Sequence, residues 1–156
     1  MKRETKKAFN WIIKILQKYN VLFEITGGLA ARVYGSKRKL EDIDIEMPNR
    51  FFDVIMPAIR EHVVYGPKRY CDNSFDLFLV TLKYKGQLID ISGSSDEKIY
   101  NKKIKAWTKE KVNYSKTVLK KIFSHFVPVI SKTELVKYKS RISRKVDKKD
   151  LEYLKR

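Results

Sequence analysis

The chain has 156 residues, of which 43% are hydrophobic and 12% aromatic. That length suits one domain and is too short for two domains of ordinary size, and the composition excludes an intrinsically disordered chain. Its 35 basic and 18 acidic residues give a net charge of +17, which favours polyanionic partners such as nucleic acid or nucleotide phosphates. A solvated, lysine-rich surface is the alternative. With one cysteine, Cys71, and no apolar run of about 18 residues, we expect a cytoplasmic protein without a membrane span.

The first half of the chain alternates between helical and extended patterns. Apolar residues spaced three and four apart predict helices, and short runs rich in β-branched residues or strict alternation predict strands. Gly27-Gly28 interrupts the first strand, and Gly35 ends the short helix that follows. The predicted ranges are 9–16 (helix), 21–26 (strand), 29–34 (short helix), 41–47 (strand) and 51–63 (helix).

The second half predicts a loop, two hairpins and two closing helices. The Gly, Pro and Asn content of 65–73 predicts the loop, and the polar stretch 93–111 has no assignable pattern. Asp150 is expected to cap the last helix, which begins at Asp147. The hairpin strands are 75–84 with 87–92 and 118–123 with 127–130, and the first closing helix is 133–144. We therefore predict one α+β domain over 1–156, with a mixed sheet covered by helices and 131–156 as closing C-terminal helices.

Two aspartates on the strand at 41–47 carry the first chemical signal. Residues two apart on a strand point to the same face, about 6.8 Å apart along the chain, so Asp42 and Asp44 lie together while Ile43 and Ile45 enter the core. Neighbouring carboxylates repel each other unless a cation lies between them, and oxygen ligands suit Mg²⁺. An acidic face that protects an edge strand from aggregation is the structural alternative.

The residues before this strand favour a phosphate site. Gly27 and Gly28 let the backbone approach a ligand closely and offer N–H groups to phosphate oxygens, and the following helix adds the positive end of its dipole. Arg38 stands four residues before Asp42, where it can meet phosphates that a metal also holds. A glycine pair alone would more often mark a turn.

This arrangement resembles the signature of the DNA polymerase beta-like nucleotidyltransferase superfamily, and its spacing is similar to that of antibiotic-modifying, tRNA-end-adding and toxin-type members. The residues that carry the resemblance are Gly27-Gly28-Leu29-Ala30, Tyr34-Gly35, Arg38 and Asp42-Ile43-Asp44. A closing helical segment of small members is similar to Pro128-Val129-Ile130, Leu135, Lys139, Arg144, Asp147, Asp150-Leu151 and Leu154. The resemblance implies that the glycines bind the nucleoside triphosphate and that the aspartates ligate two divalent metal ions, Mg²⁺ or Mn²⁺. The chain departs from the pattern at Leu40, where many members have a small hydroxyl residue.

The resemblance also implies a third carboxylate on a neighbouring strand, which we assign to Asp90. It lies in the apolar run Leu88–Ile91, where an unpaired charge is costly, and the superfamily's third acid occupies a similar strand. A salt bridge to a lysine is the alternative for Asp90, and Asp76 is the competing third acid. Lys139 lies beside the apolar stripe of its helix and either reaches toward phosphates or extends its amine into water.

We therefore predict a two-metal nucleotidyltransferase. It would use Asp42, Asp44 and Asp90 as metal ligands and catalytic groups, and Gly27, Gly28, Arg38 and Lys139 to bind an NTP such as ATP. The acceptor would be a hydroxyl, on a polyanion such as RNA or tRNA if the charge is a guide. Two alternatives stay open: a non-catalytic, basic nucleic-acid-binding or toxin–antitoxin-type partner with the same fold, and a scaffold whose aspartates only protect an edge strand.

Overall fold

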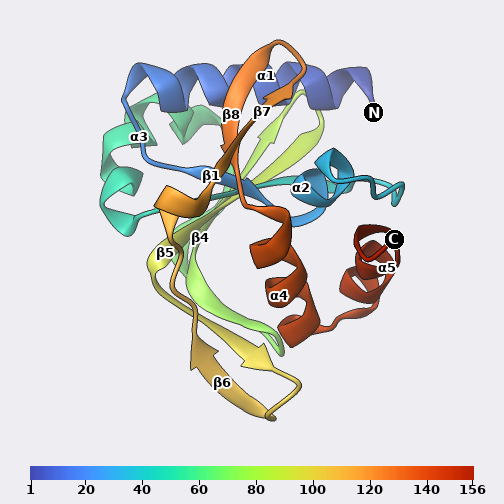
Figure 1. Ribbon diagram of the computed structural model, residues 1–156. Helices are drawn as coiled ribbons and strands as arrows, with labels where there is room; N and C mark the ends of the chain where they lie inside the picture. The colour runs from blue at the N-terminus through green and yellow to red at the C-terminus, as the bar shows by residue number, and fades with distance from the viewer.

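Eight strands form one mixed sheet in the computed structural model, which describes residues 1–156 (Figure 1). The strands are β1 (Glu24–Thr26), β2 (Asp42–Met47), β3 (Val63–Cys71), β4 (Phe75–Tyr84), β5 (Gln87–Asn101), β6 (Ala106–Lys109), β7 (Val118–Ile122) and β8 (His125–Val129). Their order is β3-β4-β5-β2-β1-β8-β7, and β6 pairs with β5. The pairs β2–β5 and β1–β8 are parallel and the others antiparallel, which confirms the predicted mixed sheet.

Five α-helices accompany the sheet: α1 (Arg3–Lys18), α2 (Gly27–Val33), α3 (Phe52–Ile59), α4 (Lys132–Ile142) and α5 (Lys145–Leu154). The predicted apolar face of α1 is fully buried, and it shares one apolar core with α3 and with Ile43 and Ile45 of β2. Because Asp42 and Asp44 alternate with these isoleucines, the aspartates lie on the opposite face of the sheet. Helices α4 and α5 lie together at the C-terminal end, away from α1 in Figure 1.

Strand β5 is much longer than predicted. The hairpin around Lys85-Gly86 forms as expected, with β4 and β5 paired from Tyr84 and Gln87 outward. However, β5 continues through the unassigned stretch to Asn101 and then pairs with β6. The β5–β6 hairpin projects beyond the rest of the sheet at the bottom of Figure 1.

Two predictions of local structure are wrong. The segment 65–73 is mostly strand, because β3 covers Val63–Cys71 and pairs with β4. It is an edge strand with one neighbour, and edge positions tolerate glycine and proline. Asp150 does not cap the last helix. Asp147 does so instead, since its carboxylate accepts a hydrogen bond from the backbone N–H of Arg144 at 3.0 Å. None of the helices is long and apolar enough to cross a membrane.

Candidate active site

Three aspartates meet on the face of the sheet opposite the main core. Asp42 and Asp44 project from β2, and Asp90 is the register partner of Asp44 on the adjacent parallel strand β5. One carboxylate oxygen from each lies within 4.8 Å of the others. Three carboxylate oxygens at that spacing match the ligand set of a hard divalent cation. The residues therefore fit the metal site that the sequence suggested.

The protein supplies little positive charge against this triad. Burial, then the charge of Asp90 and a hydrogen bond with it, raises the pKa of Asp42 to about 6. Burial, then the charges of Asp42 and Asp90, raises the pKa of Asp44 well above its ordinary value. Lys139 and Arg144 oppose this rise in the pKa of Asp44 without reversing it. A bound cation would stabilise the ionised form of these carboxylates, because it would offset both their burial and their mutual repulsion.

The neighbouring strand β4 distinguishes Asp90 from Asp76. The Thr81 hydroxyl donates a 2.6 Å hydrogen bond to Oδ1 of Asp90, its register partner, and so fixes the orientation of that carboxylate. Asp76 instead lies farther along β4, paired with Arg69 at 2.7 Å in a partly exposed ion pair. The structure therefore brings Asp90, and not Asp76, to the paired aspartates.

The two glycines lie at the start of α2, against the aspartates. Gly27 has φ of +60°, and a Cβ at this position would collide with the carboxylate of Asp44. A Cβ on Gly28 would lie 2.9 Å from Nη2 of Arg38. Position 27 therefore requires glycine, and the absence of a side chain at position 28 leaves room for the guanidinium of Arg38 against α2.

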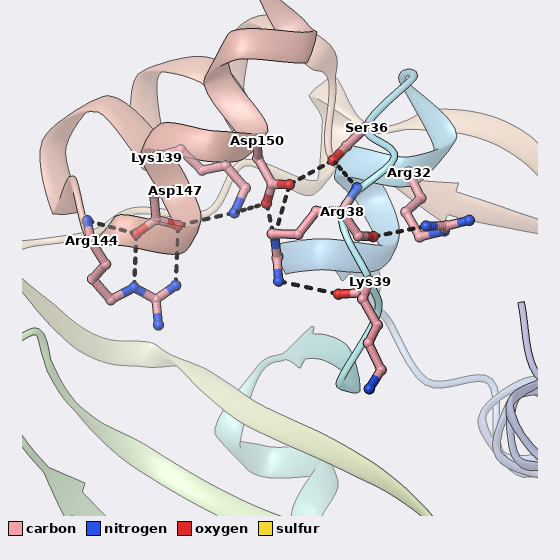
Figure 2. Close-up of polar contacts among 8 residues, drawn as sticks. All are labelled: Arg32, Ser36, Arg38, Lys39, Lys139, Arg144, Asp147 and Asp150. Atoms are coloured by element: carbon pink, nitrogen blue, oxygen red, sulfur yellow. Dashed lines mark hydrogen bonds and ion pairs between the residues drawn. The ribbon is translucent and has the colours of Figure 1, made fainter.

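Arg38 is held by a network that joins its loop to the C-terminal helices (Figure 2). Its Nε and Nη2 atoms each donate a 2.9 Å hydrogen bond to Asp150 of α5, and the Ser36 hydroxyl donates another at 2.7 Å. The amine of Lys139 lies between Asp150 and Asp147, at 3.1 and 3.0 Å. Figure 2 shows these groups converging from the loop, α4 and α5.

The network lowers the pKa of both of its aspartates below the ordinary value. Burial alone would raise the pKa of Asp150, but hydrogen bonds from Arg38 and Ser36 and the charge of Lys139 lower it below the ordinary value. The pKa of Asp147 is also lowered, because hydrogen bonding to Arg144 and the charge of Lys139 outweigh its burial. Lys139 is only 1% exposed, so its amine does not extend into water. Its role in nucleotide binding stays a prediction.

A cleft of about 570 Å³ connects these groups. Its walls include the predicted residues Gly27, Gly28, Arg38, Asp42, Asp44, Asp90 and Lys139. They also include Arg144, which the sequence placed in the closing helical segment, and Thr81, Tyr138 and Glu46, which the sequence did not mark as site residues. Glu46 carried a usable signal, because it continues the alternation of Asp42 and Asp44 along the same strand face. The cleft is large enough for a nucleotide and part of an acceptor.

Solved nucleotidyltransferases have the same fold. A candidate nucleotidyltransferase from Thermotoga maritima superposes with a TM-score of 0.76 at 19% identity, over 97% of this chain and 93% of its own. The lincosamide antibiotic adenylyltransferase LnuA, solved with lincomycin bound, gives 0.64 at 16% identity, over 97% and 96%. ANT(2″)-Ia in complex with adenylyl-2″-tobramycin gives 0.53 at 16% identity, over 83% and 71%.

These similarities show that the chain shares the fold of solved nucleotidyltransferases, a lincosamide antibiotic adenylyltransferase among them, which confirms the predicted fold class and, at the level of fold, the resemblance in the sequence. No family model matches the sequence, and neither does any curated protein. At identities of 16–19% the activity of this chain must be argued from its own residues.

Proposed function

We propose that this protein transfers a nucleotidyl group from an NTP to an acceptor hydroxyl and releases pyrophosphate. The observation that carries the proposal is the convergence of Asp42, Asp44 and Asp90 within 4.8 Å on the wall of a cleft. Gly27, Gly28 and Arg38 line the same cleft. The adenylyl transfer in the names of two structural neighbours favours ATP as the donor.

Asp42, Asp44 and Asp90 would hold divalent cations, either Mg²⁺ or Mn²⁺, because carboxylate oxygens suit both ions. Such ions neutralise the charge that develops on the phosphate oxygens and on the acceptor oxygen. The raised pKa values of Asp42 and Asp44 support this assignment, since a cation would relieve the repulsion that raises them.

The chain's own residues would bind and orient the two substrates. Backbone N–H groups at Gly27 and Gly28 would hold phosphate oxygens, and Arg38, fixed by Asp150, would present its remaining N–H groups to the triphosphate. Lys139 would contribute by holding Asp150 in place and by adding positive charge near Asp44. Asp90, oriented by Thr81, would accept the proton of the acceptor hydroxyl. The acceptor oxygen then bonds to the α-phosphorus, and the bridging oxygen leaves with pyrophosphate.

Thermal melting tests the proposal directly. Wild type and the Asp42→Asn/Asp44→Asn variant would be melted with each of the four NTPs, with and without Mg²⁺. A ligand that binds the native state raises the melting temperature. We expect a metal-dependent, nucleotide-selective rise in wild type alone. Equal curves for the two proteins under every condition would overturn the proposal. The aspartates would not then protect a sheet edge, as the scaffold alternative supposed, because β2 lies inside the sheet between β5 and β1.

A second candidate is non-catalytic nucleic-acid binding, which the β5–β6 hairpin favours. This hairpin carries exposed lysines at 102, 103, 105 and 109, and Trp107 beside them is 42% exposed. Lysines next to an exposed aromatic side chain suit a nucleic-acid backbone and a stacked base, and the same surface would serve an RNA acceptor. Salt-sensitive RNA binding that needs no metal and leaves NTPs intact would identify this function instead.

A further inference from the structure

A second, smaller cavity lies beside the proposed active site and is lined by glutamates from several elements. Its volume is about 40 Å³. Room of that size admits a few water-sized groups but no sugar or aromatic ring. Its acidic residues are Glu24 of β1, Glu46 of β2, Glu97 of β5, and Glu110 and Glu134. The proposed nucleotidyl transfer uses none of these five carboxylates.

Three of these glutamates are buried without a cationic partner. Glu24, Glu46 and Glu97 are 2%, 5% and 1% exposed. Both carboxylate oxygens of Glu97 and Oε2 of Glu24 are buried and have no hydrogen-bond partner in the chain. Glu110, in contrast, meets Arg141 at 2.8 Å. A buried carboxylate without a partner is costly, so the pocket needs either a cation or protons.

We propose that this glutamate pocket (Glu24, Glu46, Glu97 and Glu110) binds a primary ammonium group carried by the acceptor. An ammonium group is close to water in size, and its three N–H donors match acceptor oxygens that come from several directions. A compact divalent ion fits less well, because the chain's one set of three acidic side chains within 4.8 Å is Asp42, Asp44 and Asp90.

The glutamate pocket adjoins the cleft where the transfer would occur. Thr26, Glu46 and Tyr138 line both cavities. Glu46 lies two residues beyond Asp44 on the same face of β2, so an amine in the pocket lies one strand repeat from the metal-binding aspartates. An amino alcohol would thus place its amine in the pocket and its hydroxyl toward Asp90. That part of the inference rests on the proposed function, whereas binding of the amine does not.

The local charge of this pocket is opposite to that of the whole chain. The net charge of +17 favours a polyanionic acceptor, and the exposed lysines carry that charge on the surface. Among the basic side chains that line this cavity, Arg141 pairs with Glu110 at 2.8 Å and Lys116 pairs with Glu134 at 3.7 Å. Neither forms an ion pair with Glu24, Glu46 or Glu97. The group that enters the pocket is therefore selected by the buried carboxylates and not by the net charge.

Protonation is the competing way to relieve the pocket. A proton on Glu46 or Glu97 would remove the repulsion between these two carboxylates. Burial and the neighbouring carboxylates raise the pKa of Glu97 well above its ordinary value. An ammonium group and a proton make different predictions, because only the former gives a saturable response to an added amine.

The test is a titration of thermal stability with ethylammonium chloride at constant ionic strength, with tetramethylammonium chloride as the control salt. Tetramethylammonium has the same charge but no N–H donor and a larger head. We expect ethylammonium alone to raise the melting temperature of wild type with saturation. Glu97→Gln should fold, because it removes an unpaired buried charge, and should lose at least about tenfold in amine affinity. Glu61→Gln, at an exposed site on the 3₁₀ turn after α3, should respond as wild type does.

Two outcomes would overturn the inference: equal responses to the two salts, or equal responses of wild type and Glu97→Gln. Glu24→Gln serves as a second pocket variant if Glu97→Gln does not fold. Asp44→Asn separates this inference from the proposed function, since it should lose the metal-dependent response to NTP and keep the response to ethylammonium. If wild type responds to the amine but never to NTP with Mg²⁺, the proposed function fails and the cation pocket stands.

Discussion

Two buried charged regions of this protein border the same cleft, and their charges are arranged in opposite ways. In the C-terminal network, Asp147 and Asp150 meet Arg38, Lys139 and Arg144 at distances between 2.7 and 3.1 Å. On the sheet, the aspartate triad and the glutamate pocket place carboxylates beside one another. The pKa values follow this contrast, being lowered at Asp147 and Asp150 and raised at Asp42, Asp44 and Glu24.

The contrast indicates which region has its buried charges paired within the chain and which does not. The network satisfies its own charges, so its role is to hold the loop of Arg38 against helices α4 and α5. The sheet face lacks cations of its own, so it is the region that gains most from binding them. Substitutions in the network should therefore affect folding first, and substitutions on the sheet face should affect ligand binding first.

The largest effect is expected at Asp44. Asp44→Asn should reduce nucleotidyl transfer by on the order of 10³-fold, because it removes a charged group from the proposed metal site. Without metal, its melting temperature should be no lower than that of wild type, because the carboxylate that it replaces has a raised pKa. Turnover with radiolabelled NTP and a thermal melt measure the two properties. Wild-type turnover in a folded Asp44→Asn protein would exclude the mechanism.

Asp150→Asn should have the reverse profile. The substitution removes the carboxylate that Arg38 and Lys139 share and leaves these two cations without it in or near the interior. We therefore expect the free energy of unfolding to fall by about 3–5 kcal/mol. Chemical denaturation measures this loss. Asp53→Asn, an exposed acid on α3, provides the matched control and should stay within about 0.5 kcal/mol of wild type. A loss at position 150 no larger than at 53 would show that the network does not hold the helices.

The glutamate pocket should make stability depend on pH. Burial, then the charges of Glu46 and Glu134, raises the pKa of Glu24 from 4.5 to about 8. The native state therefore binds more protons than the unfolded state in this range, and its stability should fall as the pH rises from about 4.5 through 8. In Glu24→Gln, the loss of unfolding free energy between about pH 4.5 and 8 should be smaller than in wild type by on the order of a few kcal/mol. Chemical denaturation at several pH values across this range measures the difference. A profile as steep as that of Glu61→Gln would contradict the assignment.

The sequence predicted the triad better than it predicted the surroundings of the triad. Alternation along one strand was enough to place Asp42 and Asp44 on one face, and the short apolar strand around Asp90 marked its partner. In contrast, the pairing of Arg38 with Asp150 joins residues 112 positions apart. No local pattern encodes such a contact, so Asp150 was misread as a capping residue when Asp147 has that role.

The extended strands explain the other errors. β3 contains Gly66 and Pro67, which normally mark loops, and it forms a strand because β4 provides a partner along one edge. The second half of β5 is polar, so its alternation was not visible, and Glu97 in that half was not recognised as a buried residue. Its burial depends on tertiary packing, since Tyr138 and Arg141 of α4 line the same cavity, and a single sequence does not report such packing.

The smallest expected effect tests how firmly the sheet face is organised. Thr81→Val keeps the shape of the side chain but removes the 2.6 Å hydrogen bond that orients Asp90. Substituting a residue that hydrogen-bonds to a metal ligand typically lowers metal affinity or activity by about 10-fold to 100-fold. We expect a loss of about tenfold in metal affinity here, because Asp90 keeps its position on the strand. The metal concentration for half-maximal activity should rise with it, while Thr81→Ser, which retains a hydroxyl, should stay near wild type. If Thr81→Val and Thr81→Ser require the same metal concentration, the register of β2 and β5 alone positions Asp90, and the hydrogen bond from β4 does not contribute.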